Sequence, residues 1–190
     1  MKTWEQAKQS AVSLHWLATL LTGCGEIAAG VTVEAIAASD DPDVVFSAWM
    51  RAWSRRLVIA RALTTVRQDL AASARQIALR RTEKSTLLPR SRVLDPVTTK
   101  SDLERALLSI DAFPRAAVLL LVFERVPLRD AAILLDAEPD LVRKAQAAGV
   151  RELTVNLARM QGWKPAAANS NQLTKNQLTK NQLTNEWDHA

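Results

Sequence analysis

Cysteine, histidine and tyrosine are scarce in this chain, and their scarcity excludes several kinds of site. The 190 residues include one cysteine, two histidines and no tyrosine. Cys24 cannot form an internal disulfide, and together with His15 and His189 it supplies too few soft ligands for a zinc site. We interpret Cys24 as a small residue near a helix end. A catalytic thiol is the less favoured alternative, because no spacing pairs Cys24 with a histidine.

Long apolar runs are also missing. No apolar run approaches the roughly 20 uncharged residues that a membrane-spanning helix needs. The beginning of the chain, MKTWEQAKQS, lacks the apolar core of a signal peptide. We therefore expect a cytoplasmic protein without a membrane span. The sequence also has no nucleotide-binding loop and no nucleophile triad, so we expect neither an enzyme nor a cofactor.

Glycine is rare as well, with five residues, while alanine, leucine and arginine are abundant, and this composition predicts an all-α fold. Gly23 and Gly25 follow an apolar helical pattern and are expected to end that helix, because glycine adopts a left-handed cap at little cost. The apolar spacing predicts helices over 5–21, 26–39, 44–81 with a possible interruption, 102–109, 114–124, 128–135 and 140–160.

Changes in composition divide the chain into four parts. Residues 82–101 contain two prolines and several serines and threonines without a clear period, which predicts a linker. It separates a helical domain over 1–81 from a second one over 102–164. Residues 165–190 include the repeat NQLTKNQLTKNQLTN, whose five-residue period builds no apolar face, so a disordered tail is expected. The repeat is interpreted as an expansion without function, and Trp187 as a docking anchor is the weaker alternative.

Positive charge is concentrated in one segment of the chain. The net charge is −4 over residues 1–45 and zero over 93–190, whereas residues 46–92 hold eleven basic residues against two acidic ones. Arginines in this segment alternate with Trp49 and Trp53, a pattern that suits phosphate contact and stacking on unpaired bases. The alternative is a solvated helix face whose tryptophans belong to the core.

The second half of the chain contains the pattern of a helix-turn-helix. A short amphipathic helix over 128–135 is followed by a turn of about four residues and by a longer helix that carries basic residues. In this arrangement the first helix supports the second, whose exposed side chains reach base edges in the major groove. Arg143 and Lys144 lie one turn into the second helix, where such contacts are made.

The string FPRAAVLLLVFERVPLRDAAILLDAEPDLVRKAQAAGVREL resembles region 4 of extracytoplasmic-function (ECF) sigma factors. Arg115, Asp130 with Ala131, and the run Val142-Arg143-Lys144 occupy the family's characteristic places. The amino-terminal half resembles region 2 of the same family in LHWLATLLTG (residues 14–23) and in FSAWMRAWSRRL (residues 46–57). The resemblance covers about residues 13–70 and 102–158, in the family's order.

The resemblance implies a bacterial transcription-initiation factor that binds core RNA polymerase and promoter DNA, with an anti-sigma factor as a further expected partner. Region 2 would contact and open the minus-ten element, and region 4 would read the minus-thirty-five element. For DNA, the expected contacts are Arg129, Asp140, Arg143, Lys144, Ala147 and Arg151 in the carboxy-terminal half and Trp49, Trp53, Arg55, Arg56 and Arg61 in the amino-terminal half; for polymerase, they are Glu26 and Glu34.

The chain departs from the family pattern at both surfaces. The segment IAAGVTVEAIAAS lacks the acidic run with which family members dock on polymerase, and the recognition helix has AQAAG where further bases are usual. Gly149 in that string would cost about 1 kcal/mol in a helix interior. These departures favour the alternative function, a sigma-like helical adaptor or regulator that binds protein partners without recognising promoters.

Overall fold

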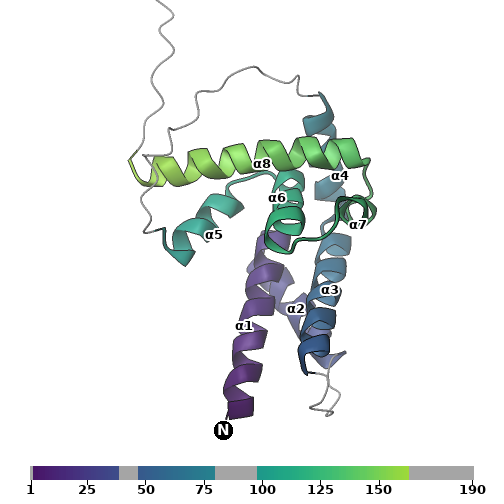
Figure 1. Ribbon diagram of the computed structural model, residues 1–190, viewed down its shortest axis with the longest axis vertical. Helices are drawn as coiled ribbons and strands as arrows, with labels where there is room; N and C mark the ends of the chain where they lie inside the picture. Colours follow the sequence, from purple (N-terminus) through teal and green to yellow (C-terminus); the bar gives the residue numbers. More distant parts are fainter. Residues whose placement is uncertain (1, 39–46, 80–97, 163–190) are drawn as a thin grey trace, which may run out of the picture.

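The structure is a computed structural model, and it describes residues 2–38, 47–79 and 98–162 (Figure 1). Within these ranges all regular elements are helical and there is no strand, which confirms the predicted all-α fold. The elements are α1 (Lys2–Thr22), α2 (Gly25–Ala37), α3 (Ser47–Thr65), α4 (Arg67–Leu79), α5 (Lys100–Leu108), α6 (Ala112–Val118), the π-helical turn η3 (Leu119–Phe123), α7 (Leu128–Leu134) and α8 (Pro139–Met160).

Helices α1, α2 and α3 form a bundle at the lower end of the molecule (Figure 1). α1 ends at Gly23, which has φ 72° and donates from its N–H to the Thr19 carbonyl oxygen at 2.8 Å. This geometry is a left-handed cap, as the sequence predicts for Gly23. Gly25 differs from the prediction, because it is the first residue of α2 and the half-buried Cys24 precedes it as N-cap.

The bundle is held together by aliphatic side chains from all three helices. Leu17, Leu20 and Leu21 of α1 are buried, as are Val31 of α2 and Val58 of α3. Burying side chains of this size stabilises a fold by about 1.5–3 kcal/mol each relative to leaving them exposed. These side chains recur at helical spacing along each helix and form the part of the core that lies within the bundle.

Helix α4 leaves this bundle and packs against the carboxy-terminal helices (Figure 1). The long predicted helix over 44–81 is interrupted at Val66, whose side chain is buried between α3 and α4. α4 places Leu70, Ser73 and Ile77 on its buried face, against α6 and α8. The hydroxyl oxygen of Ser73 accepts a hydrogen bond from the backbone N–H of Phe113 at 3.2 Å.

The carboxy-terminal helices are arranged around α6, which is almost wholly buried. α8 lies across α4, α5 and α6 (Figure 1). α5 begins with a capping box in which Thr99 and Asp102 satisfy each other's backbone N–H groups. The end of the predicted 114–124 helix is the π-turn η3, where the Glu124 N–H donates to the Leu119 carbonyl oxygen at 2.9 Å.

The two groups of helices share one continuous hydrophobic core. α1 and α5 are joined at the surface, where Trp16 Nε1 donates to Glu104 Oε2 at 3.2 Å and Lys100 Nζ lies 5.0 Å from the Trp16 ring centre. Lys100 and residue 101, which the sequence assigns to the linker, belong to α5. Most of the predicted linker, residues 82–97, and the predicted tail at 165–190 lie outside the described residues.

Candidate nucleic-acid interface

Helices α7 and α8 and the turn between them form a helix-turn-helix unit. The N–H of Asp136 donates to the Ile133 carbonyl oxygen at 3.2 Å, and that of Ala137 to the Ala132 carbonyl oxygen at 3.0 Å. This pair of bonds is a Schellman motif, with Asp136 in the left-handed position at φ 49°. Pro139 follows at the first position of α8, where the missing N–H costs nothing. The turn thereby fixes the direction in which α8 leaves α7.

One face of α8 presents the predicted base-reading residues to solvent. Asp140, Arg143 and Ala147 are exposed and follow one another at helical spacing, and Arg151 continues the row as a half-buried residue. Arg143 Nη1 lies 2.9 Å from Asp140 Oδ1 on the surface. An exposed pair of this kind contributes little to stability, so Arg143 can exchange it for another acceptor. Arg129, also predicted to contact DNA, is exposed on α7.

Lys144 differs from Arg143 because its side chain contacts helix α4. Its Nζ donates to the Ala78 carbonyl oxygen, in the last turn of α4, at 3.3 Å. The carboxyl end of a helix carries partial negative charge and free carbonyl groups, both of which attract a lysine. The structure thus places Lys144 against α4 rather than beside Arg143.

Gly149 has a packing role that the sequence pattern does not reveal. A Cβ atom on Gly149 would lie 2.7 Å from the Pro114 carbonyl oxygen and 2.7 Å from Val118 Cγ2. Only a residue without a side chain permits α8 to cross α6 at this distance. The glycine of the AQAAG string is therefore required by the crossing of the two helices, and its cost in helix propensity is offset by this contact.

Helix α3 carries the predicted phosphate-binding arginines. Arg56 and Arg61 are exposed, and Arg61 Nε is 3.9 Å from Glu34 Oε2 of α2. Trp53 is half-buried. Trp49 lies in the first turns of α3, and its side chain is outside the described residues.

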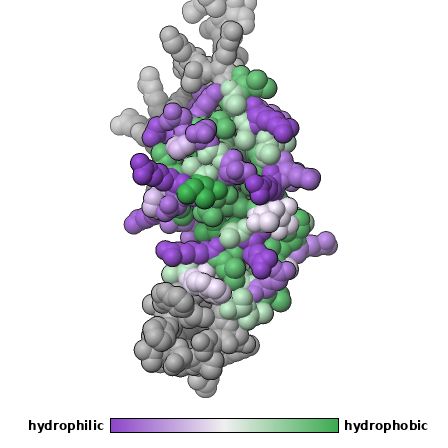
Figure 2. Space-filling view, turned by 90° about the vertical axis from the view of Figure 1, so that its right-hand side faces the viewer, coloured by the Kyte–Doolittle hydropathy of each residue, from purple (hydrophilic) through white to green (hydrophobic). Residues whose placement is uncertain are grey.

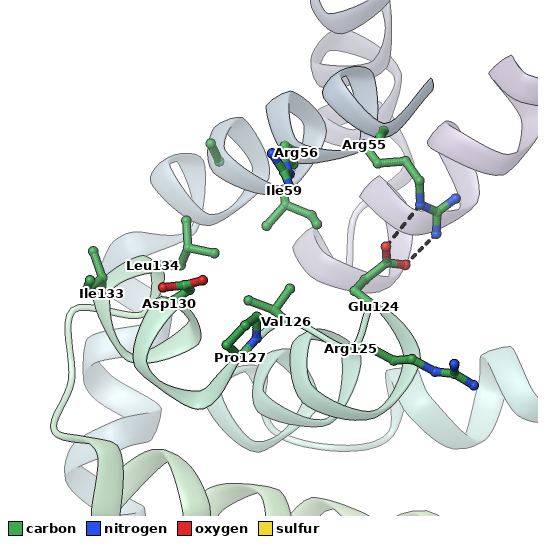
Figure 3. A pocket seen from close by; sticks show the side chains of 12 residues that line it. Arg55, Arg56, Ile59, Glu124, Arg125, Val126, Pro127, Asp130, Ile133 and Leu134 are labelled. Atoms are coloured by element: carbon green, nitrogen blue, oxygen red, sulfur yellow. Dashed lines mark hydrogen bonds and ion pairs between the residues drawn. The ribbon is translucent and has the colours of Figure 1, made fainter. Parts of the chain in front are cut away.

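Arg55 differs from Arg56 and Arg61 because its ion pair with Glu124, at the end of η3, is partly buried and has two hydrogen bonds. Both guanidinium nitrogens that face Glu124 donate to its two carboxylate oxygens, Nε at 3.0 Å (Figure 3). Arg55 Nη1 also donates to Ser13 Oγ at 3.1 Å. The hydrogen bonds to Glu124 raise the pKa of the Arg55 guanidinium above its ordinary value, although partial burial opposes the shift. Arg55 is therefore fully charged and held in place.

A cavity of about 720 Å³ lies between α3 and the η3–α7 segment, beside this ion pair (Figure 3). Its apolar lining includes Ile59, Val126 and Leu134. Arg56 and Asp130 also border it. Figure 2 views the molecule from the right-hand side of Figure 1 and shows apolar side chains interspersed with hydrophilic ones on this side.

Glu124 is not among the functional residues that the sequence pattern predicts. Its position depends on the π-turn and on Arg125, which has φ 54° and so turns the chain sharply after η3. A single acidic residue after an apolar run predicts neither the π-turn nor the positive φ of the next residue. In the sequence, Pro127 two residues after Arg125 is the only local pattern that indicates a helix end here.

The residues predicted to bind polymerase, Glu26 and Glu34, are exposed on α2. They lie eight positions apart, which places them about 80° from each other around the helix axis. Between them the exposed residues are small or apolar, as with Ala29, Gly30 and Val33. Glu26 and Glu34 are the two charged residues of α2, and Glu34 lies beside Arg61 of α3.

Arg115, one of the residues that carries the family resemblance, is buried rather than exposed. It is 7% exposed, and its Nη1 donates to the carbonyl oxygens of Ile110 at 3.0 Å and Leu108 at 3.4 Å. Burial lowers the pKa of Arg115, and the charge of Asp111 opposes this shift. Its Nη2 would lie 3.0 Å from a Cβ on Gly23, so the arginine connects the end of α1 to the α5–α6 corner.

No protein-family model, no curated protein and no solved structure matches this chain. Within the described ranges, no group of histidine, cysteine and acidic residues is placed to hold a metal ion. No helix in the same ranges is long and apolar enough to cross a membrane. The candidate site is therefore defined by its geometry and charge alone.

Proposed function

We propose that the protein is a sigma-factor-like DNA-binding protein that associates with core RNA polymerase and promoter DNA. The observation that supports this function best is the α7–turn–α8 unit, in which the Schellman motif and Pro139 set the course of α8. The exposed row of Asp140, Arg143 and Ala147 then lies in the first half of α8, where recognition helices contact base edges.

The basic face of α3 supports the same proposal. Exposed Arg56 and Arg61 lie on the same helix as the half-buried Trp53, so α3 carries positive charge together with an aromatic residue. That combination suits a DNA backbone beside unpaired bases. Glu26 and Glu34 on α2 are the proposed polymerase contacts, since both carboxylates are exposed.

The proposal predicts different roles for Arg143 and Arg56. Arg143→Ala should cost on the order of 1–3 kcal/mol on a specific site and relax sequence preference there. Arg56→Ala should weaken binding to all sequences and reduce the slope of affinity against salt by about one unit. The specific site is first selected from random duplexes in the presence of core polymerase. Fluorescence anisotropy at several salt concentrations then measures each variant on specific and random DNA.

Arg159→Ala is the matched control, because Arg159 is an exposed arginine in the last turn of the same helix. It removes the same charge but should leave sequence preference unchanged. Equal effects of Arg143→Ala and Arg159→Ala would contradict a recognition role for the first half of α8. Failure of the parent protein to bind any duplex, with or without core polymerase, would contradict DNA binding altogether.

A sigma-like adaptor is the second candidate function, and exposed apolar side chains favour it. Ile133 of α7 is 79% exposed, and Val122 and Phe123 of η3 are also exposed. Apolar surface of this kind often marks a site where another protein binds. Stable association with core polymerase without promoter-dependent run-off transcription would support the adaptor over the initiation factor.

A further inference from the structure

Two of the cations that are proposed to contact DNA are bound within the protein itself. Arg55 of α3 pairs with Glu124, which follows η3, and Lys144 of α8 donates to the Ala78 carbonyl oxygen of α4. Each contact joins one of the amino-terminal helices, α1–α4, to one of the carboxy-terminal helices, α5–α8. The contact between the two groups of helices therefore includes one proposed DNA-binding residue from each group, Arg55 and Lys144.

The surroundings of the Arg55–Glu124 pair make it costly to open. The Glu124 side chain is 12% exposed and that of Arg55 is 37% exposed. If Arg55 turned outward to a phosphate while the helices stayed in place, Glu124 would be left largely buried without its counter-charge. The cost is larger because Arg55 donates two hydrogen bonds to Glu124, and the carboxylate would lose both donors together.

A second ion pair between the same helix groups lies in quite different surroundings. Arg67 of α4 pairs with Asp136 in the turn before α8, with side chains that are 68% and 74% exposed. Water solvates both groups well when such a pair separates, so the pair stabilises the contact little. The Arg67–Asp136 pair can therefore be compared with the Arg55–Glu124 pair, because both join an arginine of the amino-terminal group to a carboxylate of the carboxy-terminal group.

We propose that this arrangement is a closed form of the protein. In it, the ion pair with Glu124 keeps Arg55 from DNA, and the hydrogen bond to α4 keeps Lys144 away from the exposed row of Asp140, Arg143 and Ala147. DNA binding then requires the two groups of helices to separate at this contact, and a carboxylate competes with phosphate for the same guanidinium. The inference rests on the proposed function, because it assigns a regulatory role to residues that are proposed to bind DNA.

The central test compares Glu124→Gln with Asp136→Asn. Both remove one negative charge from a pair between the helix groups, and asparagine is tolerated at the positive φ of residue 136. Because Glu124→Gln releases Arg55, it should tighten binding to a random duplex on the order of three- to tenfold. Asp136→Asn should change the dissociation constant by less than about twofold. Equal tightening by both variants would show a general charge effect and overturn the proposal.

Two further variants show whether the gain passes through Arg55. Arg55→Gln alone also removes the ion pair, but it should not tighten binding to the random duplex, because the guanidinium that is proposed to meet phosphate is removed with it. The double variant Arg55→Gln with Glu124→Gln should lose the gain of Glu124→Gln. A gain that persists in the double variant would overturn the proposal. Circular dichroism melts of each variant confirm folding, and the swap Arg55→Glu with Glu124→Arg restores an ion pair if a single variant unfolds.

Small-angle X-ray scattering separates this inference from the proposed function. Glu124→Gln should have a larger radius of gyration than the parent, and the swapped pair should return to the parent's value. If no form binds DNA even at low salt, the proposed function is overturned. In that case an expanded Glu124→Gln still supports the closing role of the ion pair, and an unchanged radius of gyration overturns it.

Discussion

Two glycines in helix interiors have opposite surroundings, and this contrast shows what a single residue contributes here. A Cβ on Gly149 would lie 2.7 Å from the Pro114 carbonyl oxygen and 2.7 Å from Val118 Cγ2 of α6, whereas a Cβ on Gly30 of α2 would meet nothing within 4 Å. Helix propensity alone would favour alanine at both positions. Packing reverses that preference at Gly149, because a backbone carbonyl cannot move aside as a flexible side chain can.

Gly149→Ala should accordingly lower the free energy of unfolding by about 1–3 kcal/mol, since α8 must move away from α6. Gly30→Ala should raise it by about 0.5–1 kcal/mol, because alanine loses less backbone entropy on folding. Urea unfolding of the two variants and the parent at neutral pH measures both changes. Stabilisation by both alanines would show that α8 and α6 are not in close contact.

At the scale of the element, helix α5 depends on the way in which it begins. It has nine residues, which is too short for a helix to be stable in isolation. Its capping box joins Thr99 Oγ1 to the Asp102 N–H at 3.1 Å and the Asp102 carboxylate to the Thr99 N–H at 3.3 Å. Hydrogen bonds from Thr99, together with Arg105, lower the pKa of the Asp102 carboxyl.

Because the pKa of Asp102 is lower in the folded state, its contribution to stability is present above the unfolded pKa of about 3.9 and is lost as the pH falls through the folded pKa. Thr99→Ala should lower the melting temperature by roughly 2–6 °C at pH 7. The difference between parent and variant should shrink as the pH falls below about 4. Thermal melts of both proteins from pH 7 to pH 3 measure it, and a difference that grows toward acid would contradict this role of Asp102.

At the scale of the whole molecule, α4 joins the two groups of helices more than the sequence indicates. The pattern assigns residues 67–79 to the first domain, yet Leu70 and Ile77 are buried against α6 and α8. The backbone of Phe113 at the start of α6 is bonded to Ser73 of α4. Separation of the two groups would therefore expose apolar surface on both.

Cleavage between the groups should consequently leave them associated. A protease site inserted after residue 88, within the predicted linker, should yield two fragments that elute together from a sizing column. Ile77→Asp should separate them, because it places a charge in the buried contact. The control is Gln76→Asp, an exposed position on the same helix, which should leave the fragments together. Fragments that elute separately without any substitution would show two independent domains.

The helices themselves follow from local sequence. Apolar spacing, the glycine after α1 and Pro139 at the start of α8 act within a few residues of the chain, so the all-α fold and most helix ends are predictable. The exposed row on α8 is predictable for the same reason. Helical periodicity separates Arg143 from the buried Val142 and Ala145 without reference to any other element.

Other features arise only when distant segments meet. The sequence predicts Arg55 and Lys144 as DNA contacts, and tertiary contacts across 69 and 66 residues give them Glu124 and the Ala78 carbonyl as partners. The need for Gly149 likewise comes from Pro114 and Val118 on another helix. Periodicity reports which side of a helix is apolar, but it contains no information about which helix lies opposite or at what distance. The sequence by itself thus determined the elements and their charged faces, and tertiary packing decided which of those charges are held within the protein.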